Sequence, residues 1–376
     1  MKFLHTADWQ IGKGYGQFEA AEAALLADAR FDVVARIAGL ARQAQVDLVL
    51  VAGDVFDAQG VADRTILRLF QAMADFRGPW VMIPGNHDAG LAESVWSRAA
   101  RLGAIPGNVH VCLQPQPLIL DTPGVAILPA PLVQRHTYTD LTAWFDAAVT
   151  PAGLPRVGLA HGSVQGILAE DIDAANPIAP GRAASARLDY LALGDWHGTR
   201  QVDERTWYSG TPEPDRFRNN ASGQVLQVEI AAPQAVPVVT PLASGRYRWL
   251  SWSRELRVAS DVSALLDELA QLGGDDVVQL ELAGGIDLEG HLRLERALAA
   301  AQARARSLGV ELGRLRIQPT VDDLQALRAD GYLGEVIEQL RLEEQAGEAT
   351  TARDALGILA QALERTRGAS EAGAAR

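Results

Sequence analysis

The chain has 376 residues, of which 48% are hydrophobic and 22% are charged, and its formal net charge is −13. This length allows two or three domains with a large core. The acidic balance argues against a protein that grips nucleic acid on its own, because such proteins present a basic face. The single cysteine, Cys112, excludes a disulfide framework and a cluster of thiolate metal ligands.

Targeting and membrane segments are not expected. The N-terminal stretch reaches His5 and Asp8 too early for a signal peptide. No apolar run approaches the roughly 18 residues that a membrane helix requires. Together with the low cysteine content, these features predict a cytoplasmic protein without a membrane partner.

The first part of the chain alternates between short apolar runs and amphipathic segments. Strands are predicted at 2–5, 47–51, 80–83, 109–113, 118–120, 125–128, 157–160 and 190–193, with closing strands at 207–210 and 224–230. Helices are predicted at 19–44, 63–76, 92–102 and 141–149. Residues 170–187 are predicted to form a loop at the rim of a site, because they are rich in Pro, Ala and Asp.

A composition change at 231–245, rich in Pro, Val and Ala, predicts a domain boundary. Beyond it, strands at 254–258, 277–282 and 311–317 alternate with helices at 262–272 and 288–308, and two amphipathic helices follow at 321–344 and 351–367. The predicted domains are therefore residues 1–240, residues 250–320 and a C-terminal helical segment at 321–376.

Polar residues of one chemical kind follow five of the predicted strands. They are Asp8 and Gln10, Asp54 and Asp57, Asn86 and His87, His161, and Asp195 and His197. The carboxyl ends of neighbouring strands are where ligands collect in open α/β sheets. Carboxylate, imidazole and amide groups suit Mn²⁺, Fe²⁺ or Zn²⁺. Two such ions can clamp one phosphate, and Asp54 is the carboxylate placed to lie between them.

These blocks resemble the motifs of the calcineurin-like metallophosphoesterase superfamily. The matches are Asp8, the stretch 53–57, the stretch 85–88, His161, and 194–197, in the family's order. Residues 5–9 and 208–212 look most like the SbcD/Mre11 DNA-repair nucleases. The resemblance implies an α/β fold, a metallophosphoesterase-type β-sandwich flanked by helices, with a small α/β cap domain and C-terminal helices.

The resemblance also implies a role for each site residue. Metal site one would take Asp8, Asp54 and His197, with Gln10 where the family has His. Metal site two would take Asp54, Asn86 and His161, with Asp195 where the family has His. The cofactors would be two divalent ions, Mn²⁺ first, with a bridging hydroxide as nucleophile, and His87, held by Asp57, would stabilise the leaving oxygen.

Both departures affect the metals. Asp195 keeps a good oxygen ligand for a hard cation, but Gln10 is a neutral amide and a weaker ligand, which predicts a weaker site one. Lys13, Arg216 and Arg218 are candidate phosphate-binding residues. The alternative is that the glycines around Lys13 permit a turn and that the two arginines are solvated.

The predicted function is a metal-dependent DNA phosphodiesterase, the nuclease half of a repair complex. The predicted partners are DNA and an SMC/Rad50-like ATPase that docks the C-terminal helices, and a homodimer is also considered. An ATPase that holds the DNA would reconcile nuclease activity with the acidic charge. Two alternatives stay open: a phosphoesterase for a small nucleotide-type substrate, and a non-catalytic scaffold with a decayed site.

Overall fold

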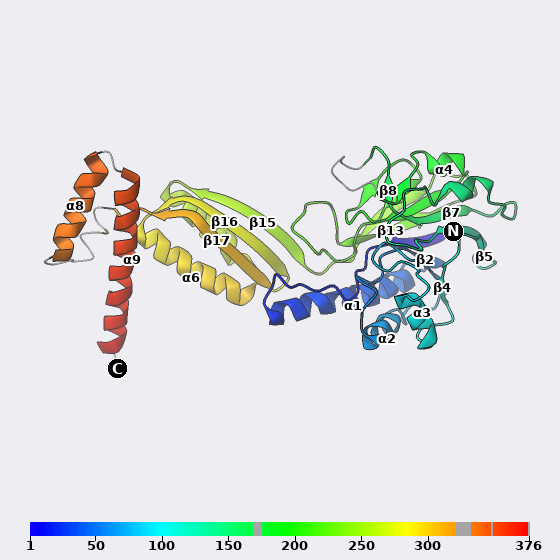
Figure 1. The fold of residues 1–376 in the computed structure, drawn as a ribbon, viewed down its shortest axis with the longest axis horizontal. Helices are drawn as coiled ribbons and strands as arrows, with labels where there is room; N and C mark the ends of the chain where they lie inside the picture. The colour runs from blue at the N-terminus through cyan, green and yellow to red at the C-terminus, as the bar shows by residue number, and fades with distance from the viewer. Residues whose placement is uncertain (168–174, 321–322, 324–331, 347–348, 375–376) are drawn as a thin grey trace. The chain divides into compact units, whose positions relative to one another are not determined.

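The computed structural model describes residues 1–376 except 168–174, 321–322, 324–331, 347–348 and 375–376. The chain divides into two compact units, Met1–Tyr247 and Arg248–Arg376. The first unit contains two mixed sheets flanked by helices, and the second contains one parallel sheet with helices (Figure 1). The structure is therefore of the mixed α/β class, as the resemblance implied.

The first sheet of the first unit has the strand order β14-β13-β1-β2-β3-β4. Its strands are β1 (Lys2–Thr6), β2 (Leu48–Ala52), β3 (Trp80–Ile83), β4 (Val109–Val111), β13 (Gln224–Glu229) and β14 (Val238–Ala243). Strands β1 to β4 run parallel, and β13 and β14 extend the sheet in antiparallel pairing. Strand β14 corrects the sequence analysis, since it lies inside the predicted linker at 231–245.

The second sheet has the order β11-β12-β10-β7-β6-β5. Its strands are β5 (Leu118–Leu120), β6 (Val125–Ala130), β7 (Arg156–His161), β10 (Tyr190–Gly194), β11 (Arg200–Gln201) and β12 (Thr206–Tyr208). The central strands β6, β7, β10 and β12 are parallel, and β5 and β11 pair antiparallel at the two edges.

The two sheets pack face to face, and strand β2 shows how the sequence separates the layers. Leu48, Leu50 and Ala52 belong to the core cluster that also contains residues of β6, β7 and β10. Val49 and Val51 point to the opposite face and join the cluster beneath the helices. Because side chains alternate along a strand, a strand buried on both faces is apolar throughout. This explains why β2 reads as an uninterrupted apolar run.

The outer faces of the sandwich are covered by helices. Helices α1 (Ala20–Gln43), α2 (Asp63–Ala72) and α3 (Val95–Arg101) contribute to the cluster on the outer side of the first sheet. Helix α3 begins three residues later than predicted, because Ser94 caps it and forms a reciprocal capping box with Ser97.

Two expectations for the second sheet's outer side were wrong. The predicted helix at 141–149 is a 3-10 turn, η1 (Ala143–Ala147). The predicted loop at 170–187 contains strand β9 (Pro177–Ile178), paired with β8 (Ser163–Val164), and the short helix α4 (Arg182–Ser185). An ion pair explains this order, because Arg182 contacts both Asp140 and Asp146.

The second unit follows the predicted strand-helix pattern with longer strands. Its parallel sheet contains β15 (Arg248–Leu256), β16 (Asp276–Ile286) and β17 (Ser307–Ile317), and the connections are α5 (Ala259–Ala270) and α6 (Leu288–Arg304). Helices α8 (Tyr332–Ala346) and α9 (Ala349–Ala374) end the chain. Most of the predicted helical stretch at 321–331 lies outside the described residues. Among the described helices, none is long and apolar enough to cross a membrane.

Candidate metal centre

The carboxyl ends of strands from both sheets meet at one edge of the sandwich. Asp8, Asp54 and Asn86 follow β1, β2 and β3 of the first sheet, while His161 ends β7 and Asp195 follows β10 of the second. Three of them, Asp8, Asp54 and His161, are buried and offer ligand atoms that all lie within 4.8 Å of one another. The tertiary structure therefore gathers residues from separate blocks of the sequence.

Glycine permits this close approach of the sheets. A Cβ at Gly194 would collide with the main-chain carbonyl of Ala52, and a Cβ at Gly53 would collide with the ring of His161. Gly53 also has φ +87°, which a residue with a side chain adopts only at a cost. The glycines of two motifs are thus required by packing between the sheets.

The backbone of the site is strained at its polar residues. Asp8, Gln10, Asp54 and Asp195 have φ values of 54°, 50°, 51° and 98°. Each such conformation costs on the order of 1–3 kcal/mol and persists where the surroundings determine it. Hydrogen bonds supply that determination, since the amide of Asp8 donates to Gly53 O at 3.1 Å and that of Gln10 to Asp54 O at 3.0 Å.

Asp54 is the carboxylate with the most partners inside the site. Its Oδ1 accepts the main-chain N–H of His87 at 2.9 Å and lies 3.6 Å from His161 Nε2. Its Oδ2 accepts from Gln10 Nε2 at 2.8 Å. The structure thus places Gln10 in direct contact with the carboxylate that was expected to lie between the metals.

His161 is oriented as a metal-binding histidine. Its Nδ1 lies 2.8 Å from the carbonyl of Ala52 and donates to it, which leaves the lone pair on Nε2. Nε2 lies 3.3 Å from Asn86 Oδ1 and 3.6 Å from Oδ1 of Asp195. Burial lowers the pKa of His161, but Asp54, Asp195 and Asp8 outweigh it and raise the pKa to about 9.

Charge balance fits a cation at this edge. Burial is the largest factor that raises the pKa of Asp8, to about 6, and it also raises the pKa of Asp195. Buried carboxylates that lie together repel one another unless positive charge is present. The donor set of carboxylate, imidazole and amide oxygens suits a divalent ion of the Mn²⁺, Fe²⁺ or Zn²⁺ type. The residues present therefore fit a metal.

His87 lies at the rim, half-buried, and its ring is held differently from the expectation. Its Nδ1 contacts the main-chain carbonyl of Asp57 at 2.8 Å, and no described hydrogen bond joins it to the Asp57 carboxylate. The tautomer that donates from Nδ1 leaves Nε2 able to accept or hold a proton. Asp57 therefore orients His87 through its backbone.

Asp88, which follows His87, is a functional residue that the sequence analysis left as one alternative among loop caps. Its carboxylate is fully buried and accepts three main-chain N–H groups: Val55 at 3.0 Å, Phe56 at 3.1 Å and Gly85 at 2.6 Å. Burial and the charge of Asp54 raise its pKa to about 7. Asp88 thus ties the loop after β2 to the loop after β3. Only the tertiary structure shows which amides it binds.

His197 faces a second buried carboxylate, Asp215, which the sequence analysis missed. Asp215 Oδ2 lies 3.3 Å from His197 Nδ1. Burial alone would raise the pKa of Asp215, but the hydrogen bond from His197 and the charge of Arg30 hold it well below its ordinary value. Arg30 is a fully buried arginine on α1. Neither residue had a signal in the sequence, since a lone Arg in a helix and an Asp in a turn are both common.

The three predicted phosphate-binding residues have different surroundings. Lys13 Nζ and Arg216 Nε each contact Asp215 at 2.9 Å, so both are ion-paired. Arg218 is exposed on the same loop. The structure therefore offers Arg218 to solvent and uses at least part of the charge of Lys13 and Arg216 internally.

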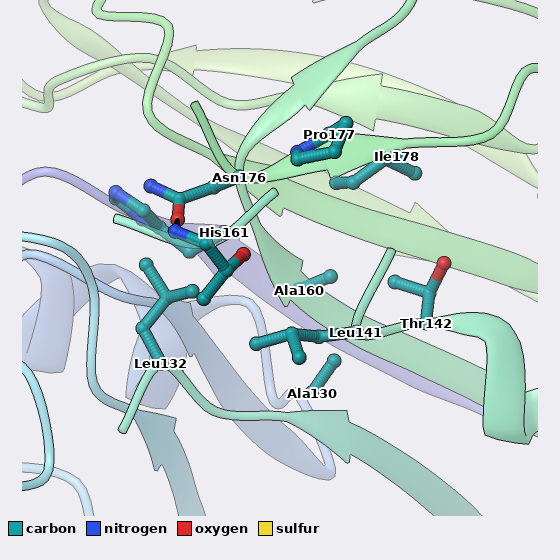
Figure 2. A pocket seen from close by; sticks show the side chains of 10 residues that line it. Ala130, Leu132, Leu141, Thr142, Ala160, His161, Asn176, Pro177 and Ile178 are labelled. Atoms are coloured by element: carbon teal, nitrogen blue, oxygen red, sulfur yellow. Dashed lines mark hydrogen bonds between the residues drawn. The ribbon is translucent and has the colours of Figure 1, made fainter. Parts of the chain in front are cut away.

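A small pocket adjoins His161 (Figure 2). Its lining is mostly apolar and comprises Ala130, Leu132, Thr137, Leu141, Thr142, Ala160, His161, Asn176, Pro177 and Ile178. Asn176 has φ 58° and its Oδ1 accepts the main-chain N–H of Thr137 at 2.8 Å. This contact fixes the loop that follows β6 beside the metal ligands.

Comparisons with known proteins agree with this geometry. Residues 1–177 match the family model for calcineurin-like phosphoesterases. These residues belong to the calcineurin-like phosphoesterase family. The matched region contains Asp8, Asp54, Asn86, His87 and His161, whereas Asp195 and His197 lie beyond it.

The phosphoesterase resembles several curated bacterial proteins, each named as the D component of the nuclease SbcCD. The Escherichia coli K12 protein is 26% identical over 311 residues, covering 70% of this chain and 75% of that protein. The Bacillus subtilis protein is 24% identical over 339 residues, covering 79% and 83%. The Rhodobacter capsulatus protein is 29% identical over 262 residues, covering 57% and 62%. A crystal structure of TT1561 of Thermus thermophilus aligns at 10% identity with a TM-score of 0.40, over 64% of this chain and 98% of that one.

The role of Asp88 gives a prediction about stability. In Asp88→Asn, the amide nitrogen replaces one acceptor oxygen and faces N–H donors, so the variant should lose about 2–4 kcal/mol of unfolding free energy. The control is Asp47→Asn, because Asp47 is exposed and accepts one main-chain N–H, from Lys2 at 2.7 Å. Urea unfolding followed by circular dichroism measures both. Equal stability of the two variants would contradict the tying role of Asp88.

Proposed function

We propose that this phosphoesterase is a metal-dependent DNA phosphodiesterase, an exonuclease of the SbcD/Mre11 type that acts in DNA repair or end processing. The observation that supports it most directly is the buried group of Asp8, Asp54 and His161 at the edge of the sandwich. The likeness to components of a named nuclease supports DNA as the substrate, over up to 79% of the chain.

The proposed ligands divide into two sets that share Asp54. Asp8, Asp54 and His197, with Gln10, would hold one divalent ion, and Asp54, Asn86, His161 and Asp195 would hold the other. Mn²⁺ is the proposed metal, because oxygen ligands outnumber nitrogen ligands in this set. Bound ions would activate a water molecule and neutralise the charge on the phosphodiester.

The chain's own residues would complete the reaction around the phosphate. His87 sits at the rim with Nδ1 held by the Asp57 carbonyl at 2.8 Å, so its ring orientation is fixed. Its Nε2 is then positioned to give a proton to the leaving oxygen. The exposed side chain of Arg218, on the loop that also carries Asp215, is available to contact a more distant phosphate.

The proposal predicts metal-dependent release of nucleotides from linear duplex DNA. A chelator should abolish the activity and Mn²⁺ should restore it. Asp54→Asn removes the shared carboxylate, and because charge stabilisation by metals contributes several kcal/mol, activity should fall by about 10³-fold. Asp47→Asn is the control, since Asp47 precedes the opposite end of the same strand β2.

A rival is a phosphoesterase for a small nucleotide-type substrate. Parallel assays on bis-p-nitrophenyl phosphate and on DNA separate the two functions. Hydrolysis of the small ester with no cleavage of DNA, even with an SMC-like ATPase present, would favour the rival. Manganese-dependent DNA cleavage that Asp54→Asn leaves intact would reject the proposed site.

Gln10 gives a separate prediction about the metals. Its amide donates to Asp54 Oδ2, whereas an imidazole at this position would offer a lone pair to a cation. Gln10→His should therefore tighten Mn²⁺ binding about tenfold, measured by calorimetry on chelator-treated protein. Gln10→Glu is a useful comparison, because it adds charge without adding an imidazole.

The same variant speaks to the scaffold alternative. If the parent protein cleaves no DNA and Gln10→His does, the natural chain is a scaffold with a decayed site. If the variant binds Mn²⁺ no more tightly than the parent, Gln10 does not limit the metal site.

The C-terminal helices are proposed to dock an SMC-like ATPase. Within the described residues, α8 and α9 pack on α6 through Leu288, Ile337, Leu356 and Ala360. Outside this contact, Leu342 is 58% exposed and Ile358 is 68% exposed. Exposed aliphatic side chains on a packed helix pair suit a protein interface. The proposed homodimer has no comparable surface assigned to it.

Capture of the ATPase by the full chain and by a chain without residues 321–376 tests this docking. The truncated chain should retain metal binding and lose capture, because the ligands lie in Met1–Tyr247. Undiminished capture by the truncated chain would place the ATPase on another surface.

A further inference from the structure

A buried ion cluster lies behind His197, on the side away from solvent. Its centre is Asp215, whose side chain is 1% exposed. Asp215 Oδ2 lies 2.9 Å from Lys13 Nζ and 3.5 Å from Arg30 Nη2. Arg216 adds a two-point contact, with Nε 2.9 Å from Oδ1 and Nη2 3.2 Å from Oδ2. The carboxylate is therefore held by three cations that come from three parts of the chain.

Arg30 anchors this cluster to the scaffold. Its guanidinium is fully buried, and its Nε donates to the Tyr15 hydroxyl at 2.9 Å. Its Nη1 donates to Thr211 Oγ1 at 2.9 Å, and Thr211 Oγ1 lies 2.9 Å from the carbonyl oxygen of Asp8. The cluster thus reaches both His197 and the strained backbone of Asp8, on opposite sides of the proposed metal site one.

Two hydrogen-bond arrangements compete at His197 Nδ1. Asp215 Oδ2 at 3.3 Å would accept a proton from Nδ1, while Arg216 Nη2 at 2.9 Å would donate a proton to it. The first arrangement carries the proton on Nδ1 and leaves the lone pair on Nε2. The second carries the proton on Nε2, where it would block a metal. The geometry of Arg216 favours the first, because both of its facing nitrogens are already directed at the Asp215 carboxylate.

We propose that Asp215 is a positioning residue that accepts the Nδ1 proton of His197 and so fixes the imidazole with its Nε2 lone pair toward Asp8 and Asp195. The inference rests on the proposed function in one respect, since His197 is a proposed metal ligand. It assigns to Asp215 the outer carboxylate role that commonly orients a metal-binding histidine. Lys13 and Arg216 then serve the cluster, which replaces their predicted role as substrate contacts.

The tautomer of His197 in the metal-free, full-length protein tests the inference without any activity measurement. Nitrogen NMR of ¹⁵N-histidine-labelled protein distinguishes the two tautomers, and His197→Gln assigns the signals among seven histidines. We expect the proton on Nδ1. A proton on Nε2 in the wild-type protein would overturn the inference, whatever the variants do.

Asp215→Asn provides the second measurement. Loss of an outer-shell carboxylate commonly reduces metal affinity by about 10–100-fold, so one Mn²⁺ equivalent should weaken by that factor in calorimetry. The His197 signals should also shift toward the other tautomer. Asp189→Asn is the matched control, because Asp189 is fully buried, accepts the Arg156 N–H at 2.7 Å, and lies at the opposite end of β10.

The outcomes separate this inference from the proposed function. A wild-type protein that binds no Mn²⁺ refutes the proposed function, and the tautomer of the metal-free protein is still decisive for Asp215. A folded Asp215→Asn variant that binds Mn²⁺ as tightly as wild type overturns the inference and leaves the proposed function standing. Equal weakening by Asp189→Asn would also overturn it, because the effect would then be one of general destabilisation.

Discussion

The site depends on buried carboxylates held together at the edge where the two sheets approach most closely. Asp54 and Asp8 are almost completely buried, and Asp195 joins them from the second sheet. Grouping these charges is unfavourable unless a proton, a cation or hydrogen bonds offset their repulsion. His161 provides part of that offset in the metal-free protein, which is why its pKa rises to about 9 despite burial. A divalent cation would offset it more completely.

The scaffold around this group includes two supporting carboxylates with opposite surroundings. Asp88 is surrounded by main-chain N–H groups and joins two loops of the first sheet. Asp215 is surrounded by side-chain cations and connects the last loop of the unit to α1. Residues from distant parts of the chain are therefore fixed in relation to one another before any ligand binds. Such preorganisation limits the reorganisation that binding and catalysis require.

The departures from the family pattern acquire a physical meaning in this setting. Asp195 keeps an oxygen ligand directed at His161, with Oδ1 3.6 Å from Nε2. Gln10 instead directs its amide at Asp54, the residue shared by both proposed ions. The two substitutions thus act differently: one adds negative charge to the site, and the other places a neutral donor on the shared carboxylate. The balance between the two proposed metal positions follows from both.

The sequence by itself determined the order of the elements and the identity of the strand-end residues. Short apolar runs such as 80–83 coincide with β3, and the five polar blocks supply the gathered residues. Local patterns carry that information because periodicity and turn residues act over a few positions. The sequence did not disclose strand β14, the amides bound by Asp88, or the buried partnership of Arg30 and Asp215. The last two features join residues that are far apart in the chain, and only the packing of the two sheets and α1 brings such residues into contact.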